Sequence, residues 1–144
     1  MPNHVTNRLE IIADNETVQK VMNFLKGVNE EDGTPCHIDF NKIIPMPKEL
    51  LIEASSSGKL GMEYLTAMQR KPLYTQDDLA TIQRVEELQE KNRKEVLQLG
   101  ASYLSNLEKY GYPTWYEWST ATWGTKWNAY HQDFEEPNIL WFDT

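Results

Sequence analysis

The stretch VTNRLEII, residues 5–12, decides how the fold begins, because its side chains alternate in character. Residues 5, 7, 9 and 11 fall on one face, and Thr6, Arg8 and Glu10 fall on the other. A period of two residues is typical of a β-strand with one buried and one exposed face. We therefore expect a strand over residues 5–12.

A helix is predicted directly after this strand. Asp14 and Asn15 are residues that cap helix N-termini, and Gly27 is well placed to end the helix. Between them, the apolar residues that share one helical face are Val18, Val21, Met22 and Leu25.

Residues 29–35 are polar and rich in turn formers, so a loop is expected there. A second strand is predicted over residues 37–44. Pro45 and Pro47 end it, because proline cannot donate a backbone hydrogen bond. The first third of the chain is thus predicted to be β-α-β.

The middle of the chain, residues 47–110, is predicted to be a mostly helical insertion. Thr75 and Asp78 have the spacing of a capping box, which predicts the start of a long helix. Gly100 is expected to mark a close approach or a bend. The apolar stripe around it consists of Val96, Tyr103, Leu107 and Tyr110.

The last third of the chain returns to strand patterns. Residues 123–130 alternate and are predicted to be a strand, residues 131–138 a polar loop, and residues 139–143 a continuous apolar strand. A continuous apolar strand is normally covered on both faces. Because the sequence stops directly after this one, we expect the fold to be incomplete at its C-terminus or a partner chain to cover the exposed edge.

Composition narrows the classes of protein. The chain has 144 residues, enough for one domain, and a net charge of −8. This charge disfavours nucleic-acid binding overall, because such affinity depends on Lys and Arg. No apolar run approaches the ~20 residues that span a bilayer, and the first residues lack a signal-peptide pattern, so a cytoplasmic location without membrane contact is predicted.

The two ends and the middle of the sequence resemble the YubB-like family of plasmid and phage proteins. The similar segments are MPNHVTNRLEI from residue 1, FNKIIPMP from residue 40, YGYPTWY from residue 110, WGTKWNAY from residue 123, and the stretch 139–144. The resemblance implies a single ferredoxin-like α+β domain over residues 1–144, with a mainly antiparallel sheet and a helical insertion at about 47–110. It implies no activity, because the family is of uncharacterised function.

No catalytic motif is found in the sequence, and no catalytic residue or cofactor is predicted. The histidines His4, His37 and His131, with Asp39 or Asp133, are weighed as metal ligands, but isolated histidines are more often structural, so no metal site is predicted. Cys36 is adjacent to His37 on a predicted strand. Neighbours on a strand point to opposite faces, which argues against a thiol nucleophile.

The best candidate for a ligand site is the segment 123–130. Its candidate residues are Trp123, Lys126, Trp127, Asn128 and Tyr130. Lys126 supplies a positive charge, Asn128 an amide that reads bases, and the tryptophans flat surfaces on which bases stack. Trp115 and Trp118 are expected to extend the platform. The competing interpretation, which we favour, is that the tryptophans fill the core.

We interpret the chain as a non-enzymatic accessory protein of a mobile genetic element that binds a protein or a small ligand. The alternatives are nucleotide or RNA binding through residues 123–130, an acidic DNA-mimic inhibitor, and an enzyme whose motif is not recognised. A dimer or higher oligomer is expected, because the last predicted strand leaves backbone groups unpaired.

Overall fold

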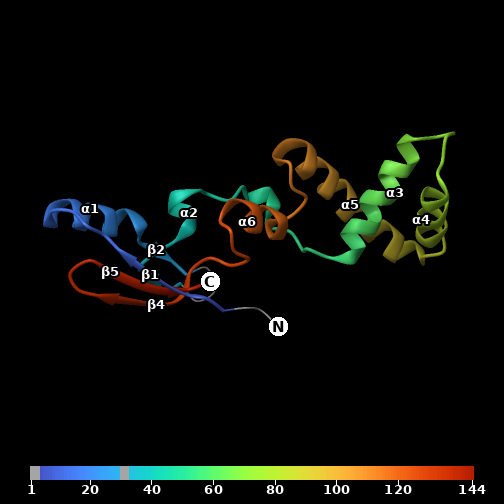
Figure 1. The fold of residues 1–144 in the computed structure, drawn as a ribbon. Coiled ribbons are helices and arrows are strands. Elements are labelled where there is room, and N and C mark those ends of the chain that lie inside the picture. The colour runs from blue at the N-terminus through green and yellow to red at the C-terminus, as the bar shows by residue number, and fades with distance from the viewer. Residues whose placement is uncertain (1–3, 30–32) are drawn as a thin grey trace. The chain divides into compact units, whose positions relative to one another are not determined.

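Three antiparallel strands form the main sheet of the computed structural model, which describes residues 4–29 and 33–144 (Figure 1). The strand order is β1 (Thr6–Glu10), β5 (Ile139–Asp143) and β4 (Tyr130–Glu135). The predicted strands at 5–12 and 139–143 and the α+β class with antiparallel pairing are therefore confirmed. β5 is the central strand, paired on both sides, so the expectation that it leaves an unpaired edge was wrong.

The strand β4 lies in the segment for which the sequence predicts a loop. Residues 130–135 form β4, because a strand at the edge of a sheet with one exposed face needs few apolar residues. Gln132 and Phe134 are its half-buried positions after Tyr130. The pairing of β4 with β5 shifts register between Tyr130 and Asp133, and His131 in this bulge has a φ of 46°.

The helix α1 (Asn15–Leu25) covers one face of this sheet (Figure 1). Its N-cap is Asp14, whose carboxylate accepts a hydrogen bond of 2.9 Å from the backbone N–H of Thr17. The core between helix and sheet consists of Val18, Met22, Leu25, Ile38 and Leu140. The capping and the apolar face predicted for this helix are therefore confirmed.

A short ribbon of β2 (Gly27–Val28) and β3 (Pro35–Cys36) follows α1. The strand predicted over residues 37–44 is wrong, because a helix, α2 (Phe40–Ile43), occupies that place. Asp39 caps it, with its carboxylate accepting a hydrogen bond of 2.9 Å from the backbone N–H of Asn41. This local cap outweighs the strand preference of the isoleucines.

The strand predicted over residues 123–130 is also wrong. Only Tyr130 belongs to a strand, and the residues before it form turns outside the sheet. Gly124 has a φ of 76°, a left-handed conformation that interrupts an extended chain. The Ser119 hydroxyl donates a hydrogen bond of 3.0 Å to the Lys126 carbonyl, which closes the loop.

The chain divides into two compact units, Met1–Met46 with Ser119–Thr144, and Pro47–Trp118. The second unit contains the 3₁₀ turn η1 (Lys48–Leu50) and the helices α3 (Ser56–Gln69), α4 (Gln76–Glu86) and α5 (Glu90–Tyr110). The helix α6 (Trp115–Thr122) carries the chain from the second unit back to the first. Helices thus occupy most of the region predicted to be helical.

Two local predictions within the second unit are confirmed. Thr75 and Asp78 form a capping box at the start of α4. At Gly100 the backbones of α3 and α5 meet so closely that a Cβ there would lie 2.2 Å from the carbonyl carbon of Gly61. The predicted stripe is correct for Val96 and Tyr103, which are buried, but Leu107 is 42% exposed.

Candidate functional site

Trp123, the first residue of the predicted site, anchors a loop. Its indole N–H donates a hydrogen bond of 3.0 Å to the carbonyl of Ile44. Its ring meets the ring of Phe40 edge to face, with 5.8 Å between the centroids. Trp123 therefore holds the segment after α6 against α2 within the first unit.

The amide of Asn128 is also engaged inside the protein. Its Oδ1 accepts hydrogen bonds from the backbone N–H groups of Phe40 (2.8 Å) and Ala129 (2.9 Å). Its Nδ2 donates to the buried carboxylate of Asp39 at 2.7 Å. The bonds to Phe40 and Asp39 join residues 88 and 89 positions apart, and the three bonds together occupy the groups with which an asparagine reads a base.

Gln132, which the sequence does not single out, has a matching role. Its side chain accepts a hydrogen bond from the backbone N–H of Ile38 and donates to the carbonyls of Ile38 and Ala129, each at 2.8 Å. Asn128 and Gln132 together attach β4 to the segment before α2. No local pattern signals this role, since the partners lie in a distant part of the sequence.

The other three predicted residues come together with His4 at one end of the sheet. The Lys126 ammonium lies 4.6 Å from the centroid of the Trp127 ring. The His4 ring stacks on Trp127 at 6.5 Å, and its Nδ1 shares a hydrogen bond with the Tyr130 hydroxyl. Burial, and then the nearby Asp143 carboxylate, raise the pKa of Tyr130. The cluster thus combines exposed aromatic surface with one permanent positive charge.

Asp143 lies beside this cluster on β5. Its carboxylate accepts a hydrogen bond of 2.7 Å from the Thr6 hydroxyl, and the His131 Nδ1 lies 3.1 Å away. The hydrogen bond from Thr6, followed by that from His131, holds the pKa of Asp143 below its usual range. Asp143 is therefore more acidic than a free aspartate.

The residues weighed as metal ligands do not gather. His37 packs against the ring of Phe134, and Asp39 caps α2. Within residues 4–29 and 33–144, no group of three or more His, Cys, Asp or Glu side chains is arranged to hold a metal ion. Burial raises the pKa of the half-buried Cys36 thiol, so this thiol is less readily ionised than a free one.

None of the helices in the part of the chain that the structure describes is both long and apolar enough to cross a membrane.

A second candidate site is the face of the main sheet opposite α1. Leu9, Leu140 and Phe134 point toward the core, so by alternation their neighbours point the other way. Arg8, Trp141 and Asp133 form one row across the three strands, and Glu10, Ile139 and Glu135 form the next. We call the surface made by these two rows and Asp143 the open sheet face.

Trp141 lies at the centre of the open sheet face and is half-buried there. Its indole N–H donates a hydrogen bond of 3.2 Å to the Glu135 carboxylate, and the Arg8 guanidinium carbon lies 5.8 Å from its ring centroid. Arg8 also pairs with Glu10 at 2.9 Å. β5 was expected to be covered on both faces. Of the described residues in the first unit, those that form the core pack on only the α1 side.

The charge of the open sheet face is negative. Its carboxylates outnumber the single guanidinium of Arg8, and they are Glu10, Asp133, Glu135 and Asp143. A flat aromatic ring with carboxylates around it offers hydrogen-bond acceptors and a π-face to a cation. This arrangement suits Lys or Arg side chains of another molecule.

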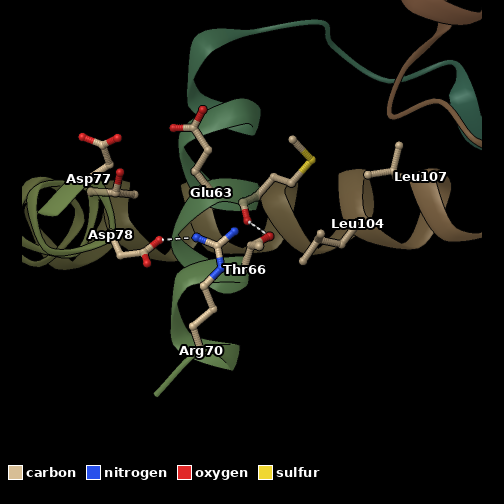
Figure 2. A pocket seen from close by; sticks show the side chains of 9 residues that line it. Glu63, Thr66, Arg70, Asp77, Asp78, Leu104 and Leu107 are labelled. Carbon is tan, nitrogen blue, oxygen red and sulfur yellow. Dashed lines mark hydrogen bonds and ion pairs between the residues drawn. The ribbon is translucent and has the colours of Figure 1, made fainter. Parts of the chain in front are cut away.

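The second unit contains a pocket of about 510 Å³ between α3, α4 and α5 (Figure 2). Figure 2 shows Arg70, the C-cap residue of α3, reaching toward Asp78 on α4, and its Nη1 lies 2.7 Å from Oδ1 of Asp78. Leu104 and Leu107 line the side contributed by α5. Asp78 is buried, and the hydrogen bond from the backbone N–H of Thr75 is the main cause that lowers its pKa. Asp78 neutralises Arg70 and takes part in the cap of α4. The pair therefore has a structural role, which is to stabilise the second unit.

Comparison of the chain with protein-family models, with curated proteins and with solved structures found no match.

Proposed function

We propose that this chain is a non-enzymatic accessory protein of a mobile genetic element that binds a positively charged segment of a partner protein on the open sheet face. The first part of the proposal depends on the resemblance to the YubB-like family. The second part depends on one observation, the half-buried Trp141 set among carboxylates at the centre of that face.

The chemistry of the face supports a cationic partner. An aliphatic Lys or Arg stem covers the indole of Trp141 while its charged end reaches Glu135 or Asp133. Charge-assisted hydrogen bonds of this kind are the strong ones in interfaces. The net charge of −8 adds long-range attraction for a basic partner and raises the rate of association.

The topology supports a ferredoxin-like domain as part of the proposal. In chain order β1, α1, β4 and β5 are a strand, a helix and two further strands. The three strands form one sheet, in which β5 lies between β1 and β4. The first three strands of a ferredoxin-like β-α-β-β-α-β domain have this order. The β2-β3 ribbon and the second compact unit are then insertions between α1 and β4.

The proposal is tested with two short peptides that differ only in having Lys or Glu at the charged positions. We expect the Lys peptide to bind and to shift the indole N–H signal of Trp141 in NMR spectra. The double variant Asp133→Lys with Glu135→Lys should weaken binding at least about tenfold, since a hydrogen bond to a charged group contributes roughly 1.5–3 kcal/mol.

A matched control keeps the same change in net charge away from the sheet. Glu95→Lys with Glu108→Lys alters two exposed positions on α5. If this control weakens the Lys peptide as much as the sheet variant does, attraction is nonspecific and the proposed site is wrong. If double-stranded DNA competes with the chain for the Lys peptide, the function takes its DNA-mimic form.

A second function, nucleotide or RNA binding, is favoured by one observation, the Lys126 ammonium over Trp127 with His4 and Tyr130 beside it. Within the segment 123–130 this function depends on Lys126, Trp127 and Tyr130, because the amide of Asn128 is engaged elsewhere. Titration with ATP and with a uridine-rich RNA, compared between the wild type and Lys126→Ala, tests it. Binding that the substitution leaves unchanged would exclude the cluster.

A further inference from the structure

The outer edge of β1 presents backbone groups that the sheet leaves unpaired. Val5 exchanges two hydrogen bonds with Thr144, and Ile11 donates one to Asn138, so the odd-numbered residues of β1 bond toward β5. In an antiparallel pair this direction alternates, and the N–H and C=O groups of Thr6, Arg8 and Glu10 therefore point away from β5. β1 ends the strand order of the sheet, and none of the described residues pairs with this edge.

The two edges of the sheet differ in how well they suit strand addition. β4, at the other edge, carries a bulge between Tyr130 and Asp133 and has acidic side chains at Asp133 and Glu135. Bulges and like charges are the features by which proteins protect an edge from pairing. β1 pairs with β5 over its whole length without a register shift and carries one cation and one anion, Arg8 and Glu10.

We propose that a second copy of this chain adds to the outer edge of β1, antiparallel and in one register, with Leu9 opposite the partner's Leu9. In this register Arg8 lies directly opposite the partner's Glu10, and Glu10 opposite the partner's Arg8. The two sheets then join into one continuous antiparallel sheet around a two-fold axis. The inference does not depend on the cationic ligand proposed for the open sheet face.

Charge selects this register over its neighbours. The neighbouring registers differ from this one by two residues on the partner strand. A shift of one residue is excluded, because it would put the cores of the two copies on opposite faces of the joined sheet. A shift one way places Arg8 opposite the partner's Arg8, and a shift the other way places Glu10 opposite the partner's Glu10. Like charges directly opposite are destabilising, whereas opposite charges stabilise a cross-strand pair.

Apolar surface favours the same register. Leu9 is half-buried beside the core, and its position on the edge strand leaves part of the side chain uncovered. Opposite the partner's Leu9 it extends the core across the axis. Ile12, which is 88% exposed just after β1, comes to lie opposite the partner's Thr6 and loses part of this exposure.

The test is sedimentation of the full chain over a range of concentrations. We expect a dimer of twice the 16.8 kDa mass of the chain. Arg8→Glu gathers four carboxylates at the axis and should raise the dissociation constant at least about tenfold, as should Glu10→Arg, which gathers four cations. The double variant with both changes restores opposite charges and should dimerise like the wild type.

A mixture of the two single variants distinguishes pairing from folding. Arg8→Glu and Glu10→Arg are complementary to each other in this register, so mixing the two weakened variants should produce a heterodimer. Glu135→Arg on β4 is the control and should leave the dimer unchanged. A wild-type chain that stays monomeric at every concentration would overturn the proposal, and so would a mixture that fails to associate while both variants keep wild-type circular dichroism.

Discussion

Replacing Leu140 with Ala should destabilise the first unit more than any equivalent change at an exposed leucine. Leu140 has no exposed surface, lies on the central strand β5 and packs with Val18, Met22 and Leu25 of α1. The change removes three carbon groups, worth ~2.4 kcal/mol of transfer free energy at ~0.8 kcal/mol each. The cavity left between helix and sheet adds up to about 2 kcal/mol, so the expected loss is about 2.5–4.5 kcal/mol.

The matched control is Leu107→Ala, the same chemical change at a side chain that is 42% exposed. There we expect a loss below about 1 kcal/mol, because surface substitutions have small effects and alanine is a good helix former. The sequence pattern alone placed Leu107 in the buried stripe of α5, so this pair of variants also tests the correction made by the structure.

The assay is urea unfolding followed by circular dichroism, together with hydrogen exchange read by mass spectrometry. Hydrogen exchange is needed because the two compact units can open separately. Leu140→Ala should increase exchange in peptides from α1, β1 and β5 and leave α3 and α5 unchanged. A loss under about 1 kcal/mol for Leu140→Ala, or equal losses for the two variants, would refute the placement of the core.

Two further predictions concern the second unit. Gly100→Ala should destabilise it by about 1–3 kcal/mol despite the higher helix propensity of alanine, because the added Cβ would lie 2.2 Å from the backbone of Gly61. Ala101→Gly, at the exposed neighbouring position, should cost only ~1 kcal/mol in the same urea assay, and a stabilising Gly100→Ala would show that α3 and α5 do not touch there. The hydrogen bond from Lys109 is the main cause that lowers the pKa of Glu49 from 4.5 to about 2, so the pair stabilises the fold above pH 4.5 and this contribution is lost as the pH falls toward 2. Glu49→Gln should therefore be less stable than the wild type well above pH 4.5 and equally stable near pH 2, and a difference that persists at the lower pH would contradict the assignment.

The candidate sites show where sequence patterns stop being informative. Lys126, Trp127 and Tyr130 were predicted to act together and do lie together with His4. Asn128 was predicted to act with them, but its amide binds the backbone N–H of Phe40 and the carboxylate of Asp39. Whether a polar side chain faces solvent or satisfies a buried partner depends on contacts 88 or more residues away, which no local pattern contains.

The open sheet face was missed for a related reason. The run Ile139-Leu140-Trp141-Phe142 is continuously apolar and was interpreted as covered on both sides. In the structure Leu140 is fully buried, while Trp141 occupies the opposite face beside Arg8 and Glu135. The alternation in β1 contained the relevant information. Its polar residues Thr6, Arg8 and Glu10 indicate that one face of the sheet is exposed, and a strand that pairs with β1 shares that face.

The sequence by itself determined the elements that depend on neighbours a few residues apart. Alternation predicted β1, the cap at Asp14 with its apolar face predicted α1, and the Thr75 and Asp78 pair predicted the start of α4. Only the tertiary structure decided that β5 is central, that β4 is a strand, and that residues 123–130 are not. The physical reason is that a strand is stabilised by hydrogen bonds to other strands, and β1, which makes β5 central, lies far from β5 along the chain. A helix and its cap are stabilised by their own neighbours.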